Sequence, residues 1–236
     1  MDITRGKGGK KSFLLDLVFP MRCPFCDEFI EYDRLCCEEC ADEILWADEN
    51  ICTVCGKFLT KGCICPDVSY DRCIPAAYFT DRARYGIHSL KFRSGKSAAD
   101  VLGRVIGDRL RVMELMNEID LAVPVPMTAI QLRQRGYNQA ELIARAIVEG
   151  TDIPIECDLL ERHNVKTSQH LLGAEERYEA VKMQYSAAQD KDLSGMTVLL
   201  ADDVLTTGAT LNYCAYLLKE KLRAKRVICG VGATTL

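Results

Sequence analysis

The chain has 236 residues, a formal net charge of −4 and 48% hydrophobic residues. This length is sufficient for one sizeable α/β domain with a small additional module, and the composition is that of a globular protein. The charge excludes a protein that is basic over its whole surface, so any binding of nucleic acid would need a local patch of Lys and Arg.

The first 20 residues, MDITRGKGGKKSFLLDLVFP, combine basic residues with an apolar stretch. The stretch is short, contains Asp16 and lacks a small-residue cleavage site, so we predict that it is not a signal peptide. No run approaches the ~20 apolar residues of a membrane span. We expect a short amphipathic helix over 13–18 and a cytoplasmic protein.

Ten of the thirteen cysteines lie at or before Cys73. Disulfide scaffolds are usually small, secreted and even in cysteine number, whereas clustered thiols in a reducing compartment are typical of metal sites. Each CxxC pair directs two thiolates at one tetrahedral ion, and two pairs complete a structural zinc site. The sequence predicts two sites, formed by Cys23, Cys26, Cys37 and Cys40 and by Cys52, Cys55, Cys63 and Cys65. The second set ends in a CxC pair, which leaves Cys73 as an alternative ligand and the number of zinc ions, one or two, open.

We divide the chain near residue 70 into a cysteine-rich module, residues 1–70, and an α/β domain, residues 71–236. Apolar spacing in the second part predicts strands over 74–79, 121–125, 155–160, 197–204 and 226–231, and helices over 83–92, 98–116, 139–148 and 209–223. Asn138 is a suitable N-cap for the third helix. The polar segment 161–189 has weak periodicity and predicts a long mobile excursion. Strands that alternate with helices predict a mostly parallel sheet with helices on both faces.

The segment that follows the strand over 121–125, PMTAIQLRQRGYNQ, is rich in hydrogen-bond donors. The donors are the side chains of Arg133, Arg135, Asn138 and Gln139. A guanidinium fork suits phosphate, so these residues are candidates for contact with an anionic group. The alternative is that both arginines are ordinary surface charges.

The most informative segment is VLLADDVLTTGAT, residues 198–210. A buried strand leads into two carboxylates, Asp202 and Asp203, and then into a hydroxyl- and glycine-rich turn that opens a helix. Ligands of open α/β sheets bind beyond the carboxyl ends of the strands, where amides at a helix N-terminus can hold a phosphate. The phosphate-binding candidates are Thr206, Thr207, Gly208, Ala209 and Thr210.

Carboxylates repel phosphate, so the two aspartates indicate a ligand that also presents sugar hydroxyls. A ribose 5-phosphate group has both features, and the segment resembles the 5-phosphoribosyl-1-pyrophosphate (PRPP) loop of type I phosphoribosyltransferases over all thirteen positions. The alternative is a strand in which Asp203 merely caps the next helix. That interpretation leaves the second carboxylate and three threonines unexplained.

Four segments, LKFRSG, VPVP with RQRGYNQAELIA, KTSQ with ER, and the loop above, occur in the order found in the ComF family. The chain resembles this family, also called ComFC, from LLDLVFPMRCPFC onward. The resemblance implies a type I phosphoribosyltransferase domain fused to an N-terminal double zinc ribbon, with PRPP and Mg²⁺ as ligands. It also implies a flexible loop that closes over substrate and contains Lys166, Thr167, Gln169 and Arg177, although Ala180 stands near the place of a family asparagine.

Two functions are compatible with these features. The first is an enzyme that transfers phosphoribosyl from PRPP to an unidentified nitrogen acceptor, with Asp202 and Asp203 at the ribose. The second is a non-catalytic accessory of DNA uptake that responds to PRPP and binds single-stranded DNA or other DNA-uptake proteins. A third, simpler possibility is a zinc-stabilised interaction module on a degenerate fold. The sequence leaves the oligomeric state open.

The distribution of charge limits where DNA could bind. Residues 1–73 hold nine Lys and Arg against fourteen Asp and Glu, a net charge of −5, so the cysteine-rich module is a poor surface for a phosphate backbone. Basic clusters lie at 82–96 and 219–226, with a third at 7–11. We expect any contact with DNA at these clusters.

Overall fold

The computed structural model describes residues 21–31, 34–59, 63, 65, 67–90, 96–165, 181–188 and 190–235. The helix expected over 13–18 lies outside the described residues, as do Lys166, Thr167, Gln169 and Arg177 of the expected flexible loop. Within the described ranges, no helix has both the length and the apolar character needed to cross a membrane.

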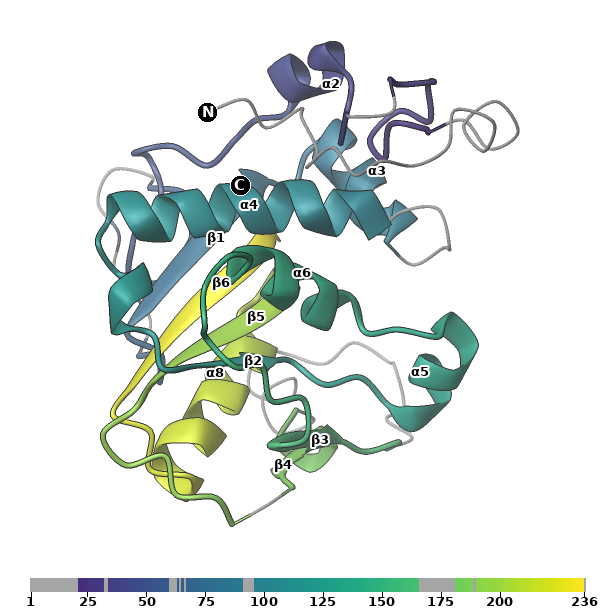
Figure 1. The fold of residues 1–236 in the computed structure, drawn as a ribbon. Coiled ribbons are helices and arrows are strands. Elements are labelled where there is room, and N and C mark those ends of the chain that lie inside the picture. The colour runs from purple at the N-terminus through teal and green to yellow at the C-terminus, as the bar shows by residue number, and fades with distance from the viewer. Residues whose placement is uncertain are drawn as a thin grey trace.

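A four-stranded parallel sheet with the order β1-β6-β5-β2 forms the centre of the molecule (Figure 1). Its strands are β1 Arg72–Tyr78, β2 Leu121–Pro124, β5 Thr197–Leu205 and β6 Arg226–Thr234. The parallel sheet and these four strands confirm the sequence prediction. β5 is an inner strand, and it continues past the end of β2, whose pairing stops at Ala201, while β6 stays paired with it as far as Leu205.

Helices cover both faces of the sheet, as predicted (Figure 1). One face packs against α3, α4 and α6, and the other against α8 and the π-helical turn that follows it. Their bounds are α3 Asp81–Ser89, α4 Lys96–Val112, α6 Gln139–Ile147, α8 Ala209–Tyr216 and the turn Leu217–Lys221. Side chains alternate along β5 because successive residues of a strand point to opposite faces. Leu199 and Ala201 therefore join the core below α4 and α6, whereas Val198 and Leu200 join the core below α8.

Two glycines bring α4 close to α6. A Cβ atom on Gly103 would lie 2.4 Å from the Cβ of Ala146, and one on Gly107 would lie 2.7 Å from the carbonyl oxygen of Ile147. Neither distance is possible for a real side chain without a backbone shift. The close crossing seats α6 over β5 and so fixes the N-terminal end of α6 at the carboxyl edge of the sheet.

The region after α6 differs from its prediction. A strand over 155–160 is wrong, because only Ile155 reaches the sheet, through a single bridge to Ala122, and the chain then turns away. The segment 161–189 is not wholly irregular either. Its described ends form an antiparallel pair, β3 Leu160–Arg162 and β4 Tyr185–Ala187.

Short helices account for the other differences. Segments α2 Glu38–Glu43 and α5 Ala129–Arg135 were not predicted, and α5 buries none of its residues, so it has no apolar periodicity to detect. The helix over 98–116 ends early at Val112, and a 3-10 turn, Met116–Glu118, follows. Glu114 between them has a positive φ of 58°, which breaks the helix.

The cysteine-rich module packs against the outer edge of the sheet. Trp46 bridges Ala77 of β1 in antiparallel fashion, and the backbone N–H of Ala47 donates to the carbonyl of Ala76 at 2.8 Å. The ring of Phe25, 1% exposed, lies so close to Gly86 of α3 that a Cβ there would be 2.3 Å from it. The module thus covers an edge strand and shares a hydrophobic core with the α/β part.

Candidate functional site

The turn after β5 has the geometry of an anion-binding loop. Thr206 and Thr207 are exposed, and Gly208 adopts a positive φ of 85° as the N-cap of α8. The backbone N–H of Ala209 has only a long contact, 3.4 Å, with the Thr207 hydroxyl. A glycine is needed at Gly208 because its conformation is left-handed. Together with Thr210, these residues surround a small hollow of about 30 Å³.

Asp202 and Asp203 precede this turn and are partly buried. The backbone N–H of Asp203 donates to Oδ1 of Asp202 at 2.8 Å, and neither carboxylate forms an ion pair within the described part of the chain. Burial raises the pKa of Asp202 well above its ordinary value of 3.8, and the negative charge of Asp203 raises it further. The backbone N–H and the nearby Arg162 offset this effect only in part, and a polyhydroxyl ligand or a cation would supply further compensation.

A cavity of about 270 Å³ opens beside the carboxylates, between the ends of β2 and β5. It brings Asp202, Asp203 and Thr210 together with Arg135, Asn138 and Gln139, although the two groups are more than 60 positions apart in the sequence. The cavity and the hollow share Asp202, Val204 and Thr210. Arg133, by contrast, is exposed on α5 and does not line the cavity.

Asn138 and Gln139 brace the loop that forms the cavity wall. Asn138 is the N-cap of α6, as predicted, since its Oδ1 accepts from the N–H of Ala140 at 3.1 Å. Its Nδ2 donates to the carbonyl of Val125 at 3.0 Å, which ties the start of α6 to the end of β2. Gln139 is 3% exposed, and its Nε2 lies 3.4 Å from the carbonyl oxygen of Leu90. The amide nitrogens of both side chains are thus engaged within the protein.

Two further residues that line the cavity, Arg162 and Tyr185, were not predicted from the sequence. They face each other across the β3–β4 pair, and the Arg162 guanidinium lies 5.2 Å from the centre of the Tyr185 ring. Arg162 donates to Oε1 of Gln184 at 3.1 Å, but its buried Nε atom has no hydrogen-bond partner within the described ranges. Its positive charge lowers the pKa of Asp202, against the larger effect of burial. The only sequence signal was an arginine next to a short apolar run.

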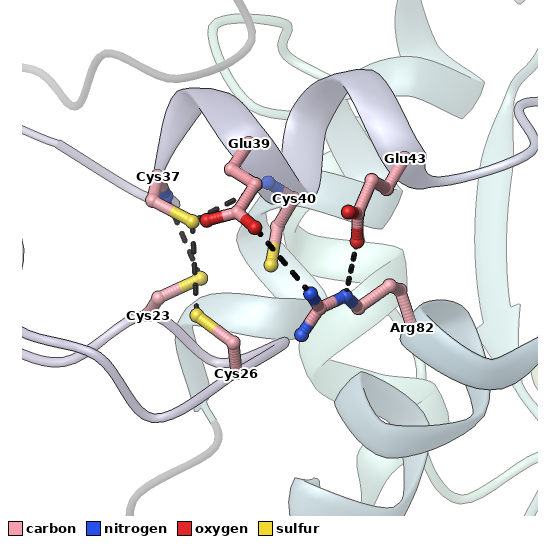
Figure 2. Close-up of polar contacts among 7 residues, drawn as sticks. All are labelled: Cys23, Cys26, Cys37, Glu39, Cys40, Glu43 and Arg82. Carbon is pink, nitrogen blue, oxygen red and sulfur yellow. Dashed lines mark hydrogen bonds and ion pairs between the residues drawn. The ribbon is translucent and has the colours of Figure 1, made fainter.

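The first cysteine cluster lies at the N-terminal end of α2 and is docked on α3 (Figure 2). The Sγ atoms of Cys23, Cys26, Cys37 and Cys40 lie within 4.8 Å of one another. Arg82 of α3 donates to Glu43 at 2.6 Å and lies 3.8 Å from Glu39, both in α2 (Figure 2). Burial raises the pKa of Cys26 to about 11, so this thiol would ionise at neutral pH only with a cation beside it.

The second cluster joins Cys52, Cys55, Cys63 and Cys65, again within 4.8 Å. Its sulfur separations are 3.4 Å for Cys52–Cys65 and Cys55–Cys63, far longer than a disulfide bond. Four sulfurs around a tetrahedral zinc ion, each about 2.3 Å from it, lie about 3.8 Å apart, so both clusters fit structural zinc. Cys73, in β1, is not among the four cysteines whose sulfur atoms lie within this distance of one another. The CxC pair therefore completes the second site.

Of the basic clusters in which we expected DNA contact, residues 7–11 and 91–95 lie outside the described residues, and several described residues at the other positions are paired with acids. Arg82 is held by Glu39 and Glu43, as described above. The pairs in the other cluster are Lys219 with Asp71, Arg223 with Asp192 and Arg226 with Glu118. These contacts reduce the positive charge that the clusters offer to a phosphate backbone.

A parallel sheet with two carboxylates and a phosphate-type turn at the end of an inner strand defines a phosphoribosyltransferase-type domain. The family described as "Phosphoribosyl transferase domain" matches residues 112–234, and the "Double zinc ribbon domain" family matches residues 14–69. The first match covers more than half of the chain, so the chain belongs to the phosphoribosyl transferase domain family, with a double zinc ribbon at its N-terminal side.

Curated relatives agree with the resemblance to the ComF family. Competence protein F of Haemophilus influenzae is 27% identical over 188 residues, which cover 78% of each chain. Competence protein ComFC of Bacillus subtilis is 24% identical over 208 residues, or 83% of this chain and 82% of that protein. DNA utilization protein YhgH of Escherichia coli is 25% identical over 182 residues, or 72% of this chain and 78% of that protein.

Proposed function

We propose that this chain binds PRPP with Mg²⁺ in the cavity at the end of β5 and transfers the phosphoribosyl group to a nitrogen nucleophile, with release of pyrophosphate. The observation that carries the proposal is the convergence of Asp202, Asp203 and Thr210 with Arg135 on one cavity of about 270 Å³. Carboxylates for the ribose, a turn for the 5′-phosphate and a guanidinium for the pyrophosphate match the three parts of PRPP.

Each part of the site has a separate task in this proposal. Asp202 and Asp203 accept hydrogen bonds from the ribose hydroxyls, and the amides and hydroxyls of Thr206–Thr210 donate to the 5′-phosphate. Arg135 donates to the pyrophosphate, whose charge Mg²⁺ would partly neutralise. In the transfer, the bond from C1′ to the pyrophosphate oxygen breaks with its electron pair on pyrophosphate. The lone pair of the acceptor nitrogen forms the new C1′–N bond, and the nitrogen proton is released.

Binding should be tested first, by calorimetric titration of the zinc-loaded protein with PRPP and Mg²⁺. We expect saturable binding to the parent and a loss of at least about tenfold in affinity for Asp203→Asn, because hydrogen bonds to charged groups contribute about 1.5–3 kcal/mol each. The matched control is Asp152→Asn, which changes an exposed aspartate in a different pocket. Equal affinity in all three proteins would refute the proposal.

Turnover is tested separately, by pyrophosphate release in the presence of PRPP and candidate nitrogenous bases. Release that depends on a base and is lost in Asp203→Asn supports the enzyme. Binding of PRPP without release for any base favours the second function, a PRPP-responsive accessory of DNA uptake. The names of the relatives, which refer to competence and DNA utilization, favour a place in that process in either case. Salt-sensitive binding of single-stranded DNA is the corresponding measurement.

A further inference from the structure

The turn of the second cysteine cluster lies directly beneath the phosphate loop. Gly56, which follows Cys55, has a positive φ of 73° and almost no space around it. A Cβ atom there would lie 2.5 Å from Sγ of Cys73 and 3.0 Å from Cδ2 of Leu205. Leu205 is the last residue of β5, 1% exposed, and the loop Thr206–Gly208 begins immediately after it.

Hydrogen bonds connect the turn of the second cluster to Tyr70, which lies beside the phosphate loop, and to strand β1. The Tyr70 hydroxyl donates to the carbonyl of Cys55 at 3.3 Å, and a Cβ on Gly208 would lie only 3.9 Å from that hydroxyl. The N–H of Cys73 in β1 donates to the carbonyl of Thr53 at 3.1 Å. These contacts place the turn against both Leu205 before the loop and Tyr70 beside Gly208.

The first cluster has an equivalent turn without this contact. Asp27 follows Cys26 as Gly56 follows Cys55, and its φ of 67° is also positive. Arg22 and Phe29 pair across the first turn as Ile51 and Phe58 pair across the second. Asp27 is more than half exposed and forms an ion pair with Arg22 at 3.5 Å. Two zinc-type turns of the same conformation therefore exist in one chain, and only the second is packed under the loop.

We propose that the second cluster, with Gly56 as its positioning residue, holds the phosphate loop in its binding conformation, so that zinc at this cluster and PRPP at the loop bind cooperatively. The proposal rests on the proposed function. If the four sulfurs separate, the turn of Cys52–Gly56 loses its fixed shape and Leu205 loses its support, which loosens the loop. Coupling between two ligands is reciprocal at equilibrium, so PRPP must also strengthen zinc binding at the second cluster.

The test is an equilibrium competition for zinc between the full-length protein and a zinc-selective chelator, with and without saturating PRPP and Mg²⁺. Of two zinc equivalents, we expect one to bind about fivefold or more tightly when PRPP is present, the low end of typical coupling. The other equivalent should be unchanged and serves as an internal control. Equal protection of both equivalents, or protection of neither, overturns the proposal.

Matched variants assign the effect to the second cluster. Gly56→Ala adds a β-carbon at a positive φ, where it meets Cys73 and Leu205, whereas Asp27→Ala places alanine at a positive φ in the equivalent turn without adding a β-carbon. Gly56→Ala should abolish the protection and weaken PRPP binding, whereas Asp27→Ala should leave both intact. If both variants behave alike, the proposal fails. The parent experiment stands independently if Gly56→Ala does not fold.

A calorimetric titration with PRPP on the same samples separates this proposal from the proposed function. Absence of PRPP binding in the parent refutes the proposed function. PRPP binding with no change in zinc affinity refutes only the coupling between the cluster and the loop.

Discussion

The partly buried carboxylate of Asp202 lowers the stability of the folded protein when it is ionised. An asparagine at position 202 has the same shape but no charge, so it would avoid both the cost of desolvating a carboxylate and the repulsion from Asp203. Since the native state holds the Asp202 proton more tightly than the unfolded chain, the stability of the parent falls as pH rises above about 3.8 toward the folded pKa.

We therefore expect Asp202→Asn to raise the melting temperature in the absence of PRPP and divalent cations, by a few degrees at neutral pH, since 1 kcal/mol corresponds to about 2–4 °C for a chain of this size. The gain should be small near pH 4 and should grow as pH rises. Differential scanning fluorimetry from pH 4.5 to 8 measures it, with Asp152→Asn as the control. A gain that is the same at every pH contradicts the argument.

Arg162 is the second cavity residue with a polar group that a ligand could pair. Its buried Nε has no partner within the described ranges, and it lines the cavity beside Asp202 and Thr210. Under the proposed function, Arg162→Gln should weaken PRPP binding by about tenfold or more, because charge-assisted hydrogen bonds to phosphate are lost.

Arg133→Gln is the matched control for Arg162→Gln, because Arg133 is exposed on α5 away from the cavity. We expect a change of less than about twofold in affinity for this control, measured by the same calorimetric titration. A larger loss for Arg133→Gln than for Arg162→Gln would restore the sequence-based assignment of Arg133 to the pyrophosphate.

At the scale of elements, the crossing of α4 and α6 determines where the cavity wall stands. Alanine is normally a better helix former than glycine by about 1 kcal/mol. At Gly103 the added methyl group would meet Ala146 at 2.4 Å and the carbonyl of Ile143 at 2.9 Å, so overpacking should outweigh that gain. We expect Gly103→Ala to destabilise the protein by about 1–3 kcal/mol in urea denaturation.

Val112→Ala is the control for Gly103→Ala, because Val112 is 85% exposed at the last position of α4. Its effect should stay within about 0.5 kcal/mol. Stabilisation by Gly103→Ala would mean that the two helices are free to move apart.

The elements that could be predicted from the sequence are those with a continuous run or regular spacing of apolar residues that become buried. The central strand β5 has four consecutive apolar residues before Asp202, and the loop after it has a composition that few other functions require. β3 and β4 escaped prediction because each has three residues and its partner lies more than 20 positions away. Arg162 was missed for the same reason, since its place at the cavity depends on that non-local pairing. Likewise, sequence alone could not show that Arg135 lines the cavity while Arg133, on the same short helix, does not.

At the scale of the whole molecule, the zinc-ribbon part and the transferase part share one core. Phe25 lies in the first zinc-type turn, yet it packs against α3 together with residues below the sheet. The single tryptophan, Trp46, lies at the junction, where it bridges Ala77. The two parts should therefore unfold together.

We expect Phe25→Ala to destabilise the protein by about 3–5 kcal/mol, as is usual for a buried phenylalanine. Denaturation followed by Trp46 fluorescence and by far-ultraviolet circular dichroism should give one coincident transition, shifted equally for both probes. Phe29→Ala, which removes a ring that is 61% exposed, should cost less than about 1 kcal/mol. A shift seen by fluorescence alone would contradict a shared core.

The two zinc-type turns also set a limit on engineering. The two turns have similar metal ligands and backbone conformations, but the residues packed against them require side chains of different size. The first needs a large ring at Phe25 to fill the space over Gly86, whereas the second has Val54 41% exposed and tolerates nothing larger than hydrogen at Gly56. A chimera in which the two pentapeptides CPFCD and CTVCG trade places should still chelate metal. It would nevertheless leave a void on one side of the sheet and a collision on the other.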